Sequence, residues 1–227
     1  MHIDDLLDLV MPAAGGGTRI GGVVPKHLLD LAGKPVFIHP LLVYERIRAI
    51  GRKIIVCQPD SAAATAEALQ RHGITNWELT DGGATRQESV RRGLDRVATD
   101  RVVIHNAAVA LVTCDLIQNV IGIDEDCVTT ATPLELNVVR GADYAEAPVN
   151  RRELKVINTP QSARTAVIRE CHARAVREGL SFSSESEMML HFGRKVRLVP
   201  GSPQSFKITT RLDLMIAEAL LRPPQAR

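Results

Sequence analysis

Short apolar segments alternate with longer amphipathic segments through most of the chain. The apolar runs at residues 6–10, 53–57, 77–79 and 101–104 have the length of buried β-strands, and each ends in glycine or polar residues. Residues 36–48, 61–72 and 87–97 instead repeat apolar positions at a period close to 3.6, with Ser61 as the expected N-cap of the second segment. Further helices are predicted at 165–178, ended by Gly179, and at 210–221. Strands that alternate with helices predict an α/β protein with a doubly wound, mostly parallel sheet.

One stretch interrupts this alternation. Residues 133–156 are polar, contain Gly141 and Pro148, and show no helical period. Taken alone, they predict a long surface loop. No linker or internal repeat divides the remainder, so we expect a single domain over residues 1–227.

Composition narrows the class of protein. Hydrophobic residues make up 45% of the 227 residues but aromatic residues only 3%, so the core must be aliphatic. That favours buried parallel strands and argues against an aromatic platform for single-stranded nucleic acid. The formal net charge of +2 is too small to indicate binding to nucleic acid or to a membrane surface. No apolar run is long enough to span a bilayer. Widely spaced cysteines and the lack of a signal-peptide pattern predict reduced thiols in a cytoplasmic protein.

The segment from residue 11 to 26, MPAAGGGTRIGGVVPK, carries the clearest chemistry. It follows the first predicted strand and combines five glycines with Arg19 and Lys26. Backbone N–H groups of such a loop can close on an anion, and the two cations can hold the same phosphates. The alternative is a glycine-rich turn with solvated cations. Lys26 follows Pro25 and position 20 is Ile20, so neither a P-loop nor a GxGxxG dinucleotide motif is present.

The arrangement resembles the 2-C-methyl-D-erythritol 4-phosphate cytidylyltransferase family of nucleotidyltransferases. Six blocks match in the family's order: PAAGGGTR, PKHLLDLAGKPVFIHPL, DGGATRQESV, IHNAA, NTPQ and SFKITTRLDLMIAEALL. Each block is weak alone, but six in order cover nearly the whole chain. In this family residues 133–156 form an extended β-arm that completes the active site of a second subunit, so the resemblance implies a homodimer.

The resemblance also assigns roles residue by residue. Cytidine triphosphate (CTP) and a polyol phosphate would be the substrates, with Mg²⁺ as the metal cofactor. Arg19, Lys26 and Lys207 are the expected catalytic residues, with Lys207 on a carboxy-terminal strand near the α-phosphate. The expected nucleotide-binding residues are Ala13, Ala14, Gly15, Gly17, Gly82, Gly83, Arg86 and Ser89, the two glycines at 82 and 83 leaving room for cytosine. Arg151 and Asn137 of the arm are the expected acceptor-binding residues. Plain alternatives are polarity at a helix N-terminus for Arg86 and Ser89, and solvated cations for Lys207 and Arg151.

The chain also departs from the family pattern. The family's HDAAR reads HNAAV here, so a metal-binding aspartate becomes Asn106, a weaker ligand, and an arginine becomes Val109. The acceptor-binding Asp-Thr-x-Lys of the arm falls on Leu136-Asn137-Val138-Val139, and the family's Thr-Asp-(Glu/Asp)-Ala-Ser falls on residues 183–187, SSESE. The nucleotide half of the expected site is kept, whereas the metal and acceptor half is changed.

Three functional hypotheses follow. The first is a cytidylyltransferase that joins CTP to methylerythritol phosphate, or to a related polyol phosphate such as ribitol 5-phosphate, and releases pyrophosphate. The second is a non-catalytic paralogue that keeps nucleotide binding but has lost the usual metal and acceptor site. The third is a nucleotidyltransferase with a different nucleobase or acceptor.

Overall fold

The central element is a seven-stranded sheet with the order β11-β7-β10-β6-β1-β4-β5. The computed structural model describes residues 6–15 and 24–222. The strands of this sheet are β1 (Leu7–Pro12), β4 (Ile50–Cys57), β5 (Trp77–Asp81), β6 (Arg101–Ile104), β7 (Cys127–Pro133), β10 (Lys155–Arg164) and β11 (Arg197–Pro200). Strand β10 runs antiparallel to β6 and β7, and the other pairs are parallel. The predicted mostly parallel α/β sheet is therefore confirmed.

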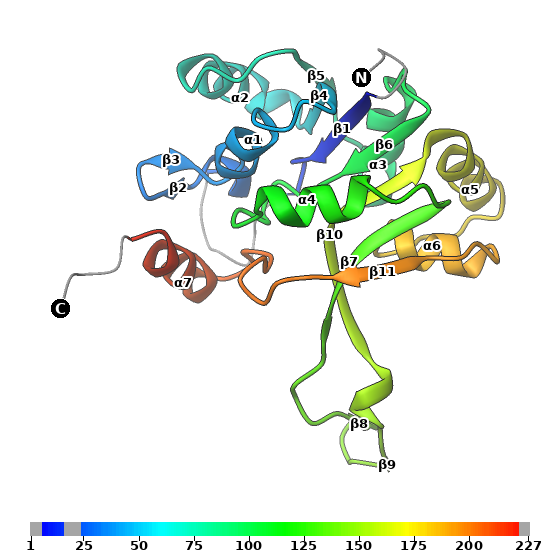
Figure 1. Ribbon diagram of the computed structural model, residues 1–227. Coiled ribbons are helices and arrows are strands. Elements are labelled where there is room, and N and C mark those ends of the chain that lie inside the picture. Colours follow the sequence, from blue (N-terminus) through cyan, green and yellow to red (C-terminus); the bar gives the residue numbers. More distant parts are fainter. Residues whose placement is uncertain (1–5, 16–23, 223–227) are drawn as a thin grey trace.

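Helices cover both faces of the sheet (Figure 1). They are α1 (Ile38–Tyr44), α2 (Pro59–Arg71), α3 (Arg86–Asp95), α4 (Cys114–Ile121), α5 (Thr165–Arg177), α6 (Glu185–His191) and α7 (Arg211–Leu221). Helices α1, α2 and α4 share one apolar cluster with the sheet, and α3, α5 and α6 share another. Helix α7 packs beside the small hairpin of β2 (Asp30–Leu31) and β3 (Lys34–Pro35).

Strand β1 shows why the apolar runs are continuous and not alternating. Leu9 and Met11 point into the first cluster, and Val10 points into the second. All three side chains are fully buried, because helices cover both faces of this central strand. On the second side, Gly93 of α3 lies against Val10, where an added Cβ would stand 2.5 Å from the Val10 Cγ1. This glycine lets α3 approach the sheet closely.

Two predicted helices need correction at their boundaries, and one predicted boundary is confirmed. Helix α1 is shorter than the predicted 36–48, ending at Tyr44. Ser61 is not an N-cap: Gln58 caps α2 with extended backbone, and Pro59 occupies its first turn, where a missing N–H is tolerated. The hydroxyl of Ser61 donates to the Gln58 carbonyl instead. The predicted end of α5 is confirmed, since Gly179 has a φ of +65°.

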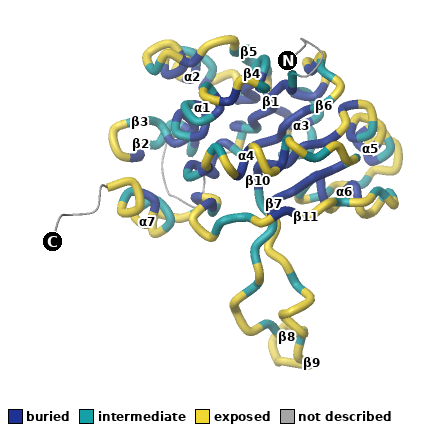
Figure 2. Tube along the Cα trace, in the orientation of Figure 1, coloured by how far each residue is buried: buried dark blue, intermediate teal, exposed yellow. Residues whose placement is uncertain are grey.

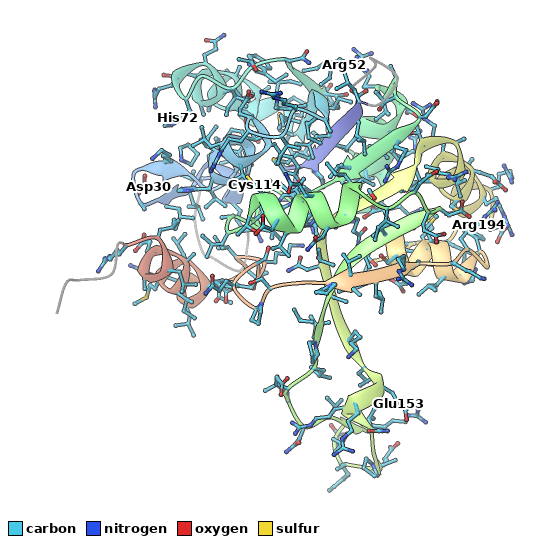
Figure 3. The ribbon with its side chains drawn as sticks, in the orientation of Figure 1. Asp30, Arg52, His72, Cys114, Glu153 and Arg194 are labelled. Carbon is cyan, nitrogen blue, oxygen red and sulfur yellow. The ribbon has the colours of Figure 1, made fainter. Side chains whose placement is uncertain are left out.

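The segment between β7 and β10 projects away from the sheet as an arm (Figure 1). It contains β8 (Val139–Arg140), β9 (Ala147–Pro148) and the 3-10 turn η4 (Arg151–Glu153), and Figure 3 places Glu153 near its far end. The arm is exposed along most of its length (Figure 2), with Leu136 73% and Tyr144 85% exposed. Large side chains this exposed on a projection are available for a partner surface.

None of the helices in residues 6–15 and 24–222 has the length and apolarity required to cross a membrane.

Candidate active site at the carboxyl ends of the strands

A pocket of about 330 Å³ opens where β1, β5 and β6 end. Loops that follow parallel strands meet at one edge of the sheet, which is the usual ligand position in α/β folds. Its lining residues are Pro12, Ala13, Ala14, Gly15, Lys26, His27, Gly83, Ala84, Thr85, Arg86, Ser89, Asn106, Ala107, Ala108, Lys207 and Thr209. The structure therefore brings together segments that are nearly 200 residues apart in sequence.

The glycine-rich loop forms one wall of the pocket. The Ala13 N–H donates to the Val56 carbonyl at 2.7 Å, which ties the start of the loop to β4. Ala14 and Gly15 follow along the wall. The predicted site residues Gly17 and Arg19 lie outside the described residues.

The turn that carries Lys26 is held by its neighbour His27. These residues form the 3-10 turn η3 (Lys26–Leu28), and His27 is 3% exposed. Its Nε2 lies 3.0 Å from the Thr65 hydroxyl, which itself donates to the Ser61 carbonyl, so Nε2 is the donor. Burial lowers the pKa of His27 to about 4, although the charge of Asp60 opposes the shift. A neutral imidazole thus fixes this turn to α2, a role that the sequence analysis missed.

The glycines at 82 and 83 serve packing within the protein. A Cβ on Gly82 would stand 2.4 Å from the Ala14 Cβ, and one on Gly83 would stand 2.3 Å from the Glu88 side chain. A side chain at either position would therefore displace protein atoms, and the expectation that these glycines leave room for cytosine stays a prediction. Ser89, 2% exposed, accepts from the Gly83 N–H at 3.0 Å and donates to the Thr85 carbonyl at 2.9 Å, so its hydroxyl holds the loop in shape.

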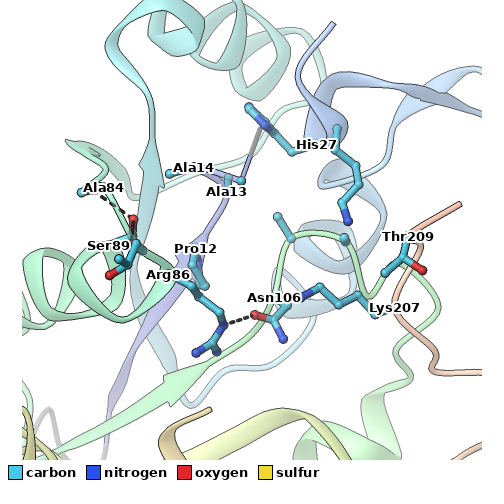
Figure 4. A pocket seen from close by; sticks show the side chains of 16 residues that line it. Pro12, Ala13, Ala14, His27, Ala84, Arg86, Ser89, Asn106, Lys207 and Thr209 are labelled. Carbon is cyan, nitrogen blue, oxygen red and sulfur yellow. Dashed lines mark hydrogen bonds between the residues drawn. The ribbon is translucent and has the colours of Figure 1, made fainter. Parts of the chain in front are cut away.

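Arg86 connects three parts of the fold at the pocket wall. It begins α3, after Thr85 caps that helix. Its Nη1 and Nη2 donate to the two carboxylate oxygens of Glu185 at 2.8 and 2.7 Å, and its Nε donates to Asn106 Oδ1 at 3.1 Å (Figure 4). The alternative was that Arg86 is only a polar residue at a helix N-terminus. Its three hydrogen bonds to Glu185 and Asn106 do not fit that alternative.

Glu185 is the partner of Arg86 that the sequence analysis did not find. It is 2% exposed, whereas the Arg86 side chain is 25% exposed. Burial raises the pKa of Glu185, but the charge and hydrogen bonds of Arg86 outweigh it and hold the pKa below its ordinary value. Burial likewise lowers the pKa of Arg86, and Glu185 reverses that shift. Both groups are ionised, so the pair adds no net charge to the pocket.

Asn106 is held by both its backbone and its side chain. Its N–H donates to the Thr159 hydroxyl at 3.1 Å, and its carbonyl accepts from the Val109 N–H at 2.9 Å. Val109 is fully buried and its carbonyl lies 2.8 Å from His105 Nε2, so position 109 offers nothing to a phosphate. The amide oxygen that a metal would use faces a guanidinium, so this contact does not favour the expected metal role of Asn106.

Lys207 and Thr209 close the side of the pocket opposite to Arg86 (Figure 4). They lie in the irregular segment between β11 and α7, so the expectation that Lys207 sits on a strand is wrong. The segment is held at two points: Asn158 Nδ2 donates to the Ser205 carbonyl at 2.6 Å, and the Ile208 N–H donates to the Ala108 carbonyl at 2.8 Å. These two bonds hold the backbone on either side of Lys207 in place beside the pocket.

The two predicted acceptor-binding residues lie elsewhere. Asn137 and Arg151 are exposed on the arm and are not among the residues that line the pocket. Arg151 donates to the Glu135 carbonyl within the same arm. The described residues of one chain therefore do not bring these two side chains to the pocket.

The donor set of the pocket suits an anion and not a divalent cation. Lys26, Arg86 and Lys207 line it, and none of the described lining residues carries a carboxylate. No cluster of three or more histidine, cysteine, aspartate or glutamate side chains with metal-binding geometry occurs among residues 6–15 and 24–222. Mg²⁺ prefers carboxylate and phosphate oxygens, so these residues do not fit a protein-held magnesium ion.

Comparison with known proteins gives one consistent result. The family model of 2-C-methyl-D-erythritol 4-phosphate cytidylyltransferase matches residues 7–223. The enzyme of that name from Streptomyces coelicolor is 34% identical, over 93% of this chain and 83% of the relative. The one from Bacillus cytotoxicus is 32% identical, over 94% of this chain and 96% of the relative.

Solved structures agree. The 2-C-methyl-D-erythritol 4-phosphate cytidylyltransferase of Thermus thermophilus superposes with a TM-score of 0.80 at 28% identity, over 95% of this chain and 98% of that one. A protein of Anaerococcus prevotii shares the fold with a TM-score of 0.85 at 24% identity, over 97% of this chain and 100% of that one. A match of this extent in sequence and in structure leads to one conclusion: the chain belongs to the 2-C-methyl-D-erythritol 4-phosphate cytidylyltransferase family.

Proposed function

We propose that this chain is a single-domain cytidylyltransferase that joins CTP to 2-C-methyl-D-erythritol 4-phosphate and releases pyrophosphate. The observation that carries the proposal is the pocket at the strand ends, which is built from backbone and cations. In the reaction a phosphate oxygen of the acceptor attacks the α-phosphorus of CTP. The bond from that phosphorus to the bridging oxygen of the β-phosphate breaks, and pyrophosphate leaves with the electron pair.

Such a displacement depends on positioning and on neutralising charge. Lys26 and Lys207 both line the pocket and, with Arg19, would hold the triphosphate. The Ala13–Gly15 backbone would contact the nucleotide. The Gly83–Ser89 loop, shaped by the Ser89 hydroxyl, would form the wall for the base.

In this proposal Mg²⁺ would be held by phosphate oxygens of the substrate and not by a side chain of the pocket. The resemblance implies Mg²⁺, and a divalent ion bound to phosphate oxygens lowers their charge. The residues of the pocket offer it no carboxylate, and the Asn106 oxygen is taken by Arg86. We therefore assign the charge neutralisation that this chain supplies to Lys26, Lys207 and Arg19.

The exposed arm supports a homodimer in which Asn137 and Arg151 reach the acceptor in the partner's pocket. We expect Lys26→Ala and Arg151→Ala to be nearly inactive alone, because each removes one part of every site. Mixing the two and exchanging subunits would recover about a quarter of the wild-type sites, since half of the dimers are mixed and each mixed dimer holds one intact site. No recovery, or a monomer by light scattering, would contradict the shared site. Within the cell we propose the cytoplasm, where four unpaired thiols are stable.

The direct test is pyrophosphate release from CTP with a panel of acceptors. The proposal expects turnover with methylerythritol phosphate, and less with ribitol 5-phosphate or with the other nucleoside triphosphates. Turnover with a different base or acceptor would support a different nucleotidyltransferase. CTP binding without turnover on any acceptor would support a non-catalytic paralogue.

A further inference from the structure

The orientation of the Asn106 side chain follows from its neighbour. A guanidinium has only N–H donors, so the Asn106 atom that faces Arg86 Nε at 3.1 Å must be the amide oxygen. Arg86 is itself fixed by its two bonds to Glu185. The Asn106 amide nitrogen therefore lies on the far side of the group, and Figure 4 shows it turned away from Arg86 within the pocket.

The charge around Asn106 points the same way. Arg86 and Glu185 balance each other, and Asn106 is neutral, so this cluster carries no negative charge that could hold a cation. The remaining charged residues of the described lining, Lys26 and Lys207, are positive. Residues 16–23, GGTRIGGV, contain no aspartate or glutamate, so the glycine-rich loop has no carboxylate in its sequence either.

We propose that Asn106 donates its amide N–H to an ionised phosphate oxygen of the substrate, and that this chain binds its nucleotide with little dependence on a divalent metal. The proposal rests on the function proposed above and assigns position 106 a different role there. Where a family aspartate would present an acceptor to a cation, this chain presents a donor to an anion. Arg86 and Glu185 are positioning residues in this arrangement, because they act through the Asn106 amide.

The decisive variant is Asn106→Asp. It has nearly the same shape, still accepts from Arg86, and places a carboxylate oxygen where the amide nitrogen was. In wild-type protein we expect calorimetry to give CTP affinities within about tenfold of each other in EDTA and in saturating Mg²⁺. In Asn106→Asp we expect the affinity in EDTA to fall by about tenfold or more, since a charge-assisted donor becomes a like charge. The affinity in Mg²⁺ should fall much less.

Two controls separate this effect from others. Asn119→Asp adds the same charge on the exposed face of α4, outside the pocket, and should leave CTP binding in EDTA unchanged. Asn106→Leu removes the donor without adding charge, and should weaken binding equally in EDTA and in Mg²⁺. Thermal melts of every variant show whether each one is folded.

The source of the phosphate oxygen is distinguished by titrating CTP, cytidine and methylerythritol phosphate separately in EDTA. Loss of CTP affinity in Asn106→Asp with cytidine unaffected assigns the oxygen to the triphosphate, whereas loss confined to methylerythritol phosphate assigns it to the acceptor. If folded Asn106→Asp binds all three as wild type does, or if wild type binds CTP only with Mg²⁺, this inference is wrong while the proposed function stands. If wild type binds CTP under neither condition, the proposed function fails as well.

Discussion

Gly82 and Ala14 are packed so closely that a Cβ on Gly82 would stand 2.4 Å from the Ala14 Cβ. The two residues belong to different loops, one after β5 and one after β1, and Gln58 bridges the same region by donating from Nε2 to the Ala14 carbonyl at 3.3 Å. The wall of the pocket therefore consists of two loops in direct contact, and the shape of one depends on the other.

Gly82→Ala should disturb both loops. The added methyl group has to displace Ala14, and overpacking of this kind costs about 1–3 kcal/mol of unfolding free energy. CTP affinity should fall with it, because Ala14 lines the pocket. Urea denaturation and calorimetry measure the two effects. Gly15→Ala is the matched control for stability, since a Cβ there meets nothing within 4 Å. Equal stabilities for the two variants would show that the contact has no energetic weight.

Lys26→Ala should weaken CTP binding by about 1.5–3 kcal/mol, the range for a hydrogen bond to a charged group. His27 holds the Lys26 turn in place, so the ammonium is partly preorganised and the upper half of the range is expected. Calorimetry with CTP is the measurement. Lys195→Ala removes a lysine outside the pocket and should bind CTP as wild type does. An unchanged affinity in Lys26→Ala would remove Lys26 from the nucleotide site.

The Arg86–Glu185 pair predicts an asymmetry between its two single variants. Arg86→Met leaves a carboxylate that is only 2% exposed without its partner, which should cost about 3–5 kcal/mol. Glu185→Gln leaves a guanidinium that is 25% exposed and can be partly hydrated, so the cost should be smaller. The double variant Arg86→Met/Glu185→Met should recover part of the loss, since no buried charge remains. Denaturation at neutral pH measures all three, and equal costs for the single variants would contradict this account of burial.

Buried histidines predict acid sensitivity. His172 on α5 is 1% exposed and both its ring nitrogens lack a hydrogen-bond partner among the described residues. Burial lowers its pKa to about 4; Glu185 and Asp95 oppose this shift, whereas Arg86 and Arg91 add to it. Because the unfolded chain binds the proton more readily, the folded state keeps its full stability above the ordinary histidine pKa of about 6.5 and loses it as pH falls toward 4.

His172→Leu should therefore be more stable than wild type at pH 5 by about 1–2 kcal/mol, and differ less at pH 7. The substitution should remove only part of the acid sensitivity, because burial also lowers the pKa values of His27 and His105 to about 4. Urea denaturation at both pH values tests this, with the exposed His191→Leu as the comparison. A difference between His172→Leu and wild type that is the same at both pH values would show that His172 does not titrate within this window.

The sequence predicted the parts of the fold that depend on local pattern. Strand β6 has the predicted bounds, and α5 begins at the predicted residue, because a buried apolar run and a helical period are visible in a single segment. Strand β10 was missed because its polar residues are satisfied from a distance: Gln161 donates to the Ser186 hydroxyl, and Ser162 donates to the Val120 carbonyl. The sequence around a strand cannot indicate hydrogen-bond partners that are so far away along the chain.

The site shows the same division. Lys26 and the Ala13–Gly15 backbone were found because glycine and cations cluster in one loop, and the pocket contains them. Glu185 could not be found in this way, since it meets Arg86 across 99 positions of sequence. That single pairing determines which atom of Asn106 faces the pocket. The metal role of position 106 was expected from the family's HDAAR block, and the contact with Arg86 does not favour it.

Strand β10 links the arm to the pocket mechanically. Its first residues form one side of the base of the arm, and its last residues lie between β6 and β7 inside the sheet. Thr159, in the middle of the same strand, accepts the backbone N–H of Asn106. The strand that forms the base of the arm is thus bonded directly to a residue that lines the pocket. In the homodimer proposed above, a tilt of the arm against the partner would therefore be passed through β10 and Thr159 to the backbone of Asn106.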